Sequence, residues 1–257
     1  MPTWDPDQYL QFNRERLRPV RDLVAQIELD KPERIVDLGC GTGSSTGVLA
    51  ERWPDTRIEG VDLSAEMLAR AKEDLPEVSW SLCDLNEWAP DCKYDLIFSN
   101  AAFQWIPAMD VLLQRCMKAL KPGGALAFQV PYNWDSPYHL CILEVAALPQ
   151  WKEKTRHALR PLCYHPIRYY YDLLAEDGHR INAWECCYHQ IVKNAEAIVE
   201  WVSGTGLRPY LQALDTDEER LAFKADLLER YQDSFPACKN GKVIFPFKRQ
   251  FVIVYAK

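Results

Sequence analysis

The sequence has no long apolar run, no basic and apolar leader at its start, and no excess of positive charge. Spanning a bilayer takes about 20 predominantly apolar residues, and no uninterrupted apolar run approaches that length. The start, Met1-Pro-Thr-Trp-Asp5, lacks the segments of a signal peptide. The net charge is -7 and the basic residues are scattered, which argues against a surface for DNA or RNA. We therefore expect a cytoplasmic protein with neither membrane nor nucleic-acid partners.

The sequence also lacks paired cysteines with CxxC spacing. Its nine cysteines are dispersed and odd in number, as is typical of reduced thiols rather than of a disulfide framework. Cys186 and Cys187 are adjacent and His189 follows, but no second ligand pair with zinc spacing is present. We predict that Cys186 and Cys187 are buried structural thiols and that the protein has no metal site.

Strand patterns alternate with helical patterns along the first half of the chain. Its 257 residues, 48% of them hydrophobic and 26% charged, suit one α/β domain that carries an insertion. A leading helix is predicted within residues 5–28. Strands are expected at residues 34–38, 57–62, 78–82, 94–99 and 125–130, with helices at residues 44–53, 64–74 and 111–120. This alternation implies a parallel sheet with right-handed crossovers.

Two stretches interrupt the alternation. Residues from about 132 to 177 are rich in proline, tyrosine and tryptophan, and residues from 195 to about 236 show helical periodicity without a strand signal. Strand patterns return at residues 181–192 and 250–255, which brings the sheet to seven strands. We predict a single domain with a mostly parallel core (residues 33–131, 180–194 and 248–257) and a helical cap formed by the two inserted stretches.

A glycine-rich turn follows the first predicted strand, in the segment Val36-Asp-Leu-Gly-Cys-Gly-Thr-Gly43. Its glycines, Gly39, Gly41 and Gly43, have G-x-G-x-G spacing, unlike the G-x-G-x-x-G turn of nicotinamide-binding folds. This spacing favours S-adenosylmethionine, which has no pyrophosphate but carries an ammonium group. We expect Asp37, two residues before the first glycine, to help hold that ammonium; the alternative is that Asp37 caps the turn.

Three further strand ends carry polar residues in the order that this cofactor requires. Asp62 ends the second strand, where a carboxylate can accept the ribose hydroxyls, while Ser64 is the better N-cap for the next helix. Asp84, followed by Leu85, is placed for the adenine amino group, although it could simply form a turn. Asn100 and Ala101 follow the fourth strand, at the edge where open α/β sheets bind ligands.

These positions resemble, in order and spacing, those of the seven-stranded class I methyltransferases. The chain is identified as a member of that superfamily. The resemblance implies a Rossmann-like fold, S-adenosyl-L-methionine as the methyl donor and S-adenosyl-L-homocysteine as the product.

The segment after the fourth strand, residues 99–105, lacks the Asn-Pro-Pro-aromatic pattern of enzymes that methylate base amino groups. No Lys/His/Glu acid–base set is evident either. A carboxylate acceptor needs none, because it is already ionised at neutral pH. We therefore assign no catalytic residue and expect catalysis by positioning and by exclusion of water.

A carboxylate acceptor needs cationic anchors, and a guanidinium binds carboxylate with two hydrogen bonds. The candidates are Arg16, Arg18, Arg208 and Arg249. Trp105, His139 and Tyr170 could line an apolar pocket with polar tips. The alternatives are that the arginines are solvated or ion-paired and that the aromatic residues belong to the core.

Several segments resemble the trans-aconitate methyltransferases in the same order along nearly the whole chain. They are Trp4-Asp-Pro-x-x-Tyr-Leu-x-Phe12, Glu15-Arg16-x-Arg18-Pro19, Asn100-Ala-x-Phe-Gln-Trp105, Asn133 with His139, Tyr170-Tyr171 and Gly204-Thr-Gly-Leu-Arg-Pro209, with Arg249 after a late Phe-Pro. The resemblance implies transfer of a methyl group to one carboxylate of an unsaturated tricarboxylic acid, which yields its monomethyl ester.

The chain departs from that family at Thr42 and Ser44 in the glycine turn, at Tyr132, and by the extra pair Phe247-Lys248. The last two changes leave open another small carboxylic acid as the substrate. A non-catalytic S-adenosylmethionine-binding regulatory protein is a further alternative, whereas the glycine spacing disfavours a nicotinamide oxidoreductase. The sequence does not decide between a monomer and a weak homo-oligomer.

Overall fold

The computed structural model describes residues 13–90, 92–158, 163–175 and 178–257, with side chains from residue 17 onward. Two compact units divide the chain. The core unit comprises Met1–Pro131, Cys163–Cys186 and Arg249–Lys257, and the helical unit comprises Tyr132–Leu162 and Cys187–Lys248. The predicted start of the leading helix and the motif at residues 4–12 lie outside the described residues.

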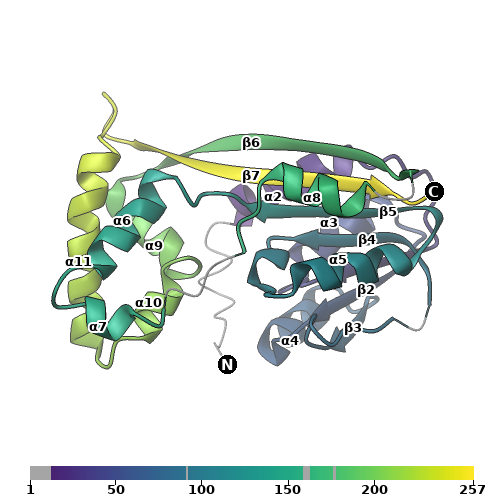
Figure 1. The fold of residues 1–257 in the computed structure, drawn as a ribbon, viewed down its shortest axis with the longest axis horizontal. Helices are drawn as coiled ribbons and strands as arrows, with labels where there is room; N and C mark the ends of the chain where they lie inside the picture. Colours follow the sequence, from purple (N-terminus) through teal and green to yellow (C-terminus); the bar gives the residue numbers. More distant parts are fainter. Residues whose placement is uncertain (1–12, 91, 159–162, 176–177) are drawn as a thin grey trace. The chain divides into compact units, whose positions relative to one another are not determined.

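Seven strands form one sheet in the order β3-β2-β1-β4-β5-β7-β6 (Figure 1). Strands β1 to β5 pair in parallel, and β7 is antiparallel to β5, which confirms the predicted seven-stranded, mostly parallel fold. The strands are β1 (Arg34–Leu38), β2 (Arg57–Asp62), β3 (Ser79–Leu82), β4 (Tyr94–Asn100), β5 (Leu120–Pro131), β6 (Arg180–Val192) and β7 (Val243–Tyr255).

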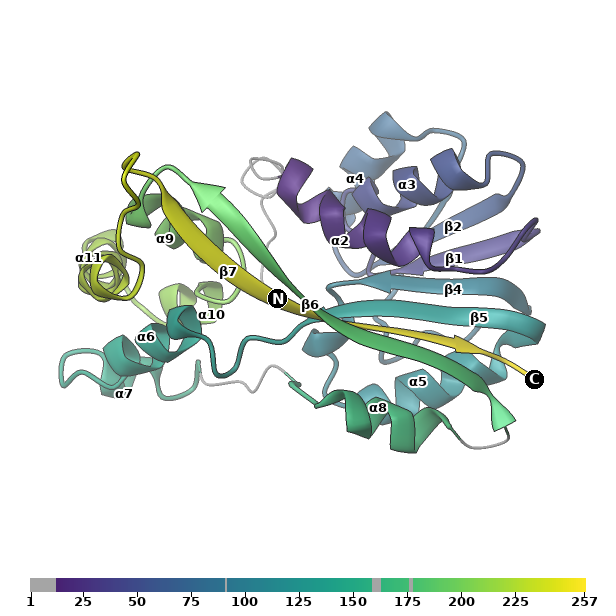
Figure 2. The same cartoon turned by 90° about the horizontal axis from the view of Figure 1, so that it is seen from above.

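Helices cover both faces of the core unit's sheet (Figure 2). Helices α2 (Asn13–Ala25), α3 (Ser44–Arg52) and α4 (Ala65–Asp74) lie on one face, and α5 (Met109–Lys118) and α8 (Ile167–Leu174) lie on the other. A short 3-10 helix, η1 (Phe103–Trp105), follows β4. Helix α8 belongs to the core unit, although its residues lie within the first stretch that interrupts the sequence pattern.

Side chains alternate between the two faces along each strand. On the α5 and α8 face, Ile97, Phe128 and Val252 belong to one buried apolar cluster. On the α2 and α3 face, Tyr255 at the end of β7 accepts a hydrogen bond through its hydroxyl from the N–H of Glu28, just beyond α2. The polar residues of the candidate site lie on this second face.

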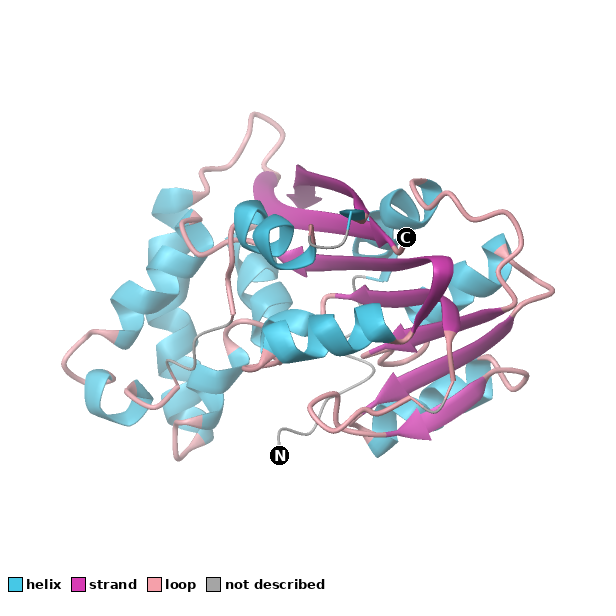
Figure 3. Ribbon diagram, turned by 45° about the vertical axis from the view of Figure 1, so that its right-hand side comes forward, coloured by secondary structure: helices cyan, strands magenta, loops and turns pink. Residues whose placement is uncertain are grey.

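The helical unit contains α6 (Pro137–Ala146), α7 (Lys152–Thr155), α9 (Ala195–Ser203), α10 (Arg208–Gln212) and α11 (Asp217–Ser234) (Figure 3). Helices at residues 195–236 confirm the helical periodicity found there. Tyr231 of α11 is fully buried, and its hydroxyl donates a hydrogen bond to the carbonyl of Tyr138 in α6 (3.0 Å). Phe245 and Phe247 at the start of β7 pack on the Tyr138 ring at centroid distances of 5.6 and 5.5 Å.

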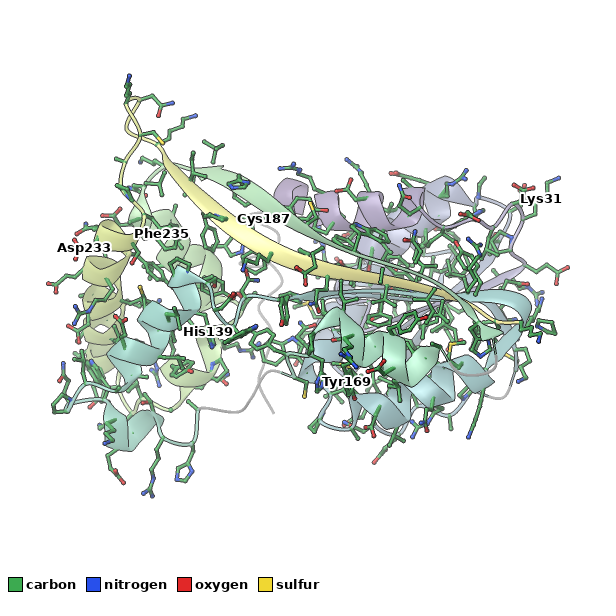
Figure 4. The ribbon with its side chains drawn as sticks, turned by 45° about the horizontal axis from the view of Figure 1, so that its top comes forward. Lys31, His139, Tyr169, Cys187, Asp233 and Phe235 are labelled. Atoms are coloured by element: carbon green, nitrogen blue, oxygen red, sulfur yellow. The ribbon has the colours of Figure 1, made fainter. Side chains whose placement is uncertain are left out.

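The prediction that Cys186 and Cys187 are buried is wrong. Cys187 is exposed and Cys186 is half-buried (Figure 4). Both lie on β6, at the end of the strand order, where alternate side chains point away from the packed face. In the described part of the chain, no three His, Cys, Asp or Glu side chains are grouped to hold a metal.

None of the described helices has both the length and the apolar character required to cross a membrane.

Replacing Tyr231 by phenylalanine should destabilise the protein by about 1 kcal/mol, because it removes a buried hydrogen bond while keeping the ring. Urea unfolding followed by circular dichroism would measure the change. Tyr171→Phe is the matched control, since Tyr171 is exposed on α8. Equal stability losses in the two variants would contradict the role assigned to the Tyr231 hydroxyl.

Candidate functional site at the carboxyl edge of the sheet

The glycine turn between β1 and α3 is held close to two neighbouring strands. The N–H groups of Gly39 and Cys40 both donate to the carbonyl of Val61 in β2, at 2.7 and 3.1 Å. A Cβ atom at Gly39 would lie 2.2 Å from the Cβ of Ala102, which follows β4. Gly39 also has a φ of 74°. Glycine is therefore required at this position for two independent reasons.

Gly41 lies in the same turn but has open space beside it. Its φ is 56°, and no heavy atom comes within 4 Å of the place where a Cβ would be. Its N–H donates to Asp62 Oδ2 at 2.8 Å. The turn therefore presents bare backbone at a point where a ligand can approach closely.

Asp37, at the end of β1, is fully buried. Its Oδ2 accepts hydrogen bonds from the hydroxyls of Ser45 and Thr46 in the first turn of α3, both at 2.7 Å, while Oδ1 is buried without a hydrogen-bond partner. Burial raises the pKa of Asp37 to about 6, although the two hydroxyls lower it. Asp37 thus holds the start of α3 with one oxygen and leaves the other oxygen for a cationic donor.

Asp62 accepts one backbone hydrogen bond on each carboxylate oxygen. Oδ2 accepts from Gly41, and Oδ1 accepts from the N–H of Ser64 at 2.9 Å. Ser64 in turn accepts from the N–H of Met67, which confirms Ser64 as the N-cap of α4. Burial raises the pKa of Asp62. Each oxygen retains a second lone pair, so Asp62 can accept two further hydrogen bonds.

The next residue, Leu63, is 47% exposed beside this carboxylate. Sequence reasoning missed it as a candidate. The signal that could have found it is a large apolar side chain directly after a strand-ending acid, where a loop normally carries polar residues.

The loop after β3 carries Asp84 and Leu85. Asp84 Oδ1 accepts from both the backbone N–H and the side-chain amide of Asn86, at 2.8 Å each. This confirms a turn-forming role, and Oδ2 takes no part in these bonds. Leu85 is buried, with its side chain 3.8 Å from the place where a Cβ of Gly39 would lie.

Asn100 ends β4 at the same edge, and Ala101 follows it. Asn100 Oδ1 accepts from Nε2 of Gln129 at 3.1 Å. Ala101 has a φ of 55°, and no other described residue apart from glycine has a positive φ. The carbonyl of Gln129 accepts from the Ala101 N–H at 2.9 Å, and the Gln104 side chain donates to the Ala101 carbonyl. Backbone strain of this kind concentrates at functional sites.

Arg249, one of the residues predicted to bind the methyl acceptor, lies in the sheet itself, on β7. It is 9% exposed, and its Nη1 donates to Oε1 of Gln129 at 2.9 Å. Because β7 is antiparallel to β5, the Arg249 end of β7 lies beside the carboxyl end of β5. Asn100, Gln129 and Arg249 therefore form a hydrogen-bonded row across β4, β5 and β7. We call this row the Gln129 network.

The other core-unit residues that were predicted to bind the methyl acceptor lie in different surroundings. Arg18 is exposed on α2, and the side chain of Arg16 lies outside the described residues. Trp105 is 38% exposed on η1. Tyr170 is fully buried on α8, edge-on to Phe128 at 5.2 Å, in the apolar cluster on the opposite face of the sheet. The structure does not bring Tyr170 to the face that carries Arg249.

Two candidates belong to the helical unit. His139 lies half-buried on α6 (Figure 4), and burial lowers its pKa. Arg208 begins α10 and is also half-buried.

Two of the residues that depart from the expected family pattern, Tyr132 and Lys248, are joined by a backbone hydrogen bond within the helical unit. The backbone of Lys248 exchanges two hydrogen bonds with the Asn133 side chain (2.8 and 2.9 Å), and its carbonyl also accepts from the Tyr132 N–H. The ammonium of Lys248 pairs with Asp135.

Comparison of folds agrees with this geometry. Coclaurine N-methyltransferase, solved with N-methylheliamine and S-adenosylhomocysteine, superposes with a TM-score of 0.59 at 15% identity, covering 99% of this chain and 82% of that one. The Haemonchus contortus phosphoethanolamine N-methyltransferase 2, solved with S-adenosyl-L-methionine, gives 0.56 at 18% identity, covering 93% and 52%. These similarities show a shared Rossmann-like fold.

Comparison of sequences is more specific. Residues 35–124 match the model of a methyltransferase domain family. The trans-aconitate 2-methyltransferase of Azoarcus sp. (strain BH72) is 46% identical over 98% of this chain and 99% of its own length. The Shigella flexneri serotype 5b protein of the same name is 37% identical over 98% of both chains. The chain therefore belongs to the trans-aconitate 2-methyltransferase family.

Proposed function

We propose that the protein transfers a methyl group from S-adenosyl-L-methionine to one carboxylate of trans-aconitate, forming the monomethyl ester and S-adenosyl-L-homocysteine. The observation that carries this proposal is that one edge of the sheet holds both a buried carboxylate and a buried guanidinium. A buried acid with an unpartnered oxygen, Asp37, adjoins an open glycine turn, and a buried guanidinium, Arg249, lies across the same face. The first suits a cationic donor and the second suits an anionic acceptor.

The residues at the carboxyl ends of β1 to β4 would hold the methyl donor. Asp37 Oδ1 would accept from the ammonium group, and Asp62 would accept from the ribose hydroxyls with its remaining lone pairs. Asp84 Oδ2 and the Leu85 backbone would bind the adenine edge. Gly39, Gly41 and Gly43 let the backbone come close, and Asn100 and Ala101 border the reacting end. When bound, the cofactor supplies a methyl group on a positively charged sulfonium.

The arginines would fix the acceptor. Arg249 can pair with a carboxylate through two parallel N–H groups, and Arg16 and Arg18 lie on α2, which covers the same face of the sheet. Trp105 remains a proposed contact to the acid, and the roles predicted for His139 and Arg208 of the helical unit stay predictions. Tyr170 no longer belongs to this set, because it is buried in the apolar cluster on the opposite face of the sheet.

The transfer needs no general base. The carboxylate oxygen would accept the methyl group from the sulfonium, which would keep the electron pair of the broken carbon–sulfur bond. No proton leaves the acceptor, because the acid is already ionised at neutral pH. The residues of the chain would therefore act by positioning the oxygen in line and by excluding water.

We also propose that the chain works as a single methyltransferase domain in the cytoplasm, on a small-molecule acid and without nucleic acid. Its nine cysteines include none in a disulfide, and its net charge is -7. Both features suit a reduced compartment and a small substrate.

Incubation with methyl-labelled S-adenosyl-L-methionine and single acids tests this function. The panel comprises trans-aconitate, cis-aconitate, citrate, isocitrate, fumarate and itaconate, scored by base-labile methyl ester. We expect kcat/KM for trans-aconitate to exceed that for the others by at least about tenfold. Fumarate and itaconate lack a third carboxylate, and cis-aconitate, citrate and isocitrate place their three carboxylates in a different geometry, so each would leave at least one hydrogen bond unmade. Ester on no acid, with S-adenosylhomocysteine bound normally, would contradict an enzymatic role and favour a regulatory protein.

Replacing Gly41 by alanine should weaken S-adenosylhomocysteine binding by about tenfold or more, because the new methyl group occupies space needed by the ligand. Gly123→Ala is the matched control. Gly123 has a φ of 75° and equally open surroundings. It lies near the amino-terminal end of β5, away from the carboxyl edge that holds the site. Both variants should lose about 1 kcal/mol of stability through backbone strain. Isothermal titration calorimetry that finds equal affinities would remove the turn from the site.

Affinity for S-adenosylhomocysteine should rise between about pH 5 and about pH 7. Asp37, with its pKa of about 6, must lose its proton before it can accept from the ligand's ammonium. Free α-amino groups stay protonated below about pH 7.7, so the ligand itself does not titrate here. In the unliganded protein the raised carboxyl pKa has the opposite effect, and stability should fall as pH rises from about 4 to about 6.

Asp37→Asn should remove the pH dependence of binding and lower the affinity at pH 7, as measured by calorimetry across this range. Asp110→Asn is the control, since Asp110 lies exposed in the first turn of α5. If the affinity of Asp37→Asn for S-adenosylhomocysteine still changes with pH as in the wild type, the titrating group is not Asp37.

A further inference from the structure

Gln129 is a fully buried polar residue near the carboxyl end of β5, in an otherwise apolar part of the strand. Its neighbours in β5, Ala127, Phe128 and Val130, are all buried and apolar. We infer that Gln129 is a positioning residue that fixes both the guanidinium of Arg249 and the amide of Asn100. The inference rests on the proposed function. Gln129 would link Arg249, which is proposed to bind the acid, to Asn100, which is proposed to border the cofactor.

The three side chains of the Gln129 network share one face of the sheet. Asn100 pairs directly with Gln129 in the β4–β5 register. Gln129 pairs with Phe251 in the β5–β7 register, and Arg249 lies two residues from Phe251 and so on the same face. The two hydrogen bonds, at 3.1 and 2.9 Å, follow from this alignment.

Donor and acceptor identities allow only one orientation of the two amides. A guanidinium can only donate, so Gln129 Oε1 must face Arg249. Gln129 Nε2 then faces Asn100 and donates, which requires Asn100 to present Oδ1. The NH2 group of Asn100 is therefore turned away from Gln129, as a donor for another partner.

That donor suits a carboxylate. Two carboxylates meet at this edge in the proposed reaction, one on the amino-acid end of the cofactor and one on the acid substrate. Gln129 thus sets the direction in which Asn100 can donate.

Neutrality of Gln129 matters as much as its geometry. An uncharged partner holds Arg249 in place without setting a negative charge against the guanidinium. A glutamate at position 129 would accept from Arg249 and place a negative charge against it, and when ionised it could no longer donate to Asn100. A methionine would keep the length of the side chain and make neither bond.

The test compares Gln129→Glu and Gln129→Met with Gln250→Met. Gln250 is an equally buried glutamine on β7, but its amide donates to Glu185 instead of entering the Gln129 network. We expect both Gln129 variants to raise KM for trans-aconitate about tenfold or more, as loss of a charged hydrogen bond would, with a much smaller change in kcat. Gln250→Met should leave KM unchanged.

Equilibrium binding titrations show which of the two carboxylates, that of the cofactor or that of the acid, accepts from Asn100. Weaker S-adenosylhomocysteine binding in Gln129→Glu would assign the Asn100 donor to the cofactor. Unchanged cofactor binding, with weaker trans-aconitate binding in its presence, would assign it to the acid. KM and both affinities within about twofold of the wild-type values in Gln129→Glu would overturn the proposal.

A measurement without turnover distinguishes failure of this inference from failure of the proposed function. In the cofactor-free protein, side-chain amide protons of Gln129 should exchange slowly with solvent, as observed by 15N NMR, because both ends of the amide are bonded and buried. Fast exchange would overturn the network even if the wild-type enzyme forms ester. Slow exchange with no ester on any acid would contradict only the proposed function.

Discussion

The close approach of three strands at Gly39 is the constraint on which the site depends. The turn is bonded to β2 through Val61 and lies against Ala102 after β4 so tightly that no side chain fits. Because parallel strands end at the same edge, fixing this point also fixes the acids that follow each strand. Asp37 and Asp62 are held by main-chain and hydroxyl groups near the turn, so the site is built largely from backbone geometry.

Features encoded by short stretches of sequence were predictable. The glycine spacing, the acid two residues before it and the serine that caps α4 each depend on neighbours within about four residues, and the structure confirms their local geometry. The seven strands were predictable for the same reason, since each is a short apolar run bounded by turn residues. Strand β7 is longer than expected because its first residues, including the polar Lys248, alternate with aromatic ones.

Features that depend on distant pairing were not predictable from the sequence. Gln129 is bonded to partners 29 and 120 residues away, so nothing beside it in sequence indicates its importance. Tyr170 shows the converse problem, because aromatic residues that could line a pocket have the same spacing as those that fill a core. Cys187 was misjudged because a thiol is usually buried, whereas its position on β6 leaves it exposed.

Ala101 has a consequence for how a ligand is received. A left-handed conformation costs a residue with a side chain roughly 1–2 kcal/mol, and here Gln104 and the β5 backbone hold it in place. The hydrogen bonds that offset this cost form within the protein itself and require no ligand. The loop after β4 is then already ordered in its strained shape, so binding loses little conformational entropy there and more of the contact energy appears as affinity.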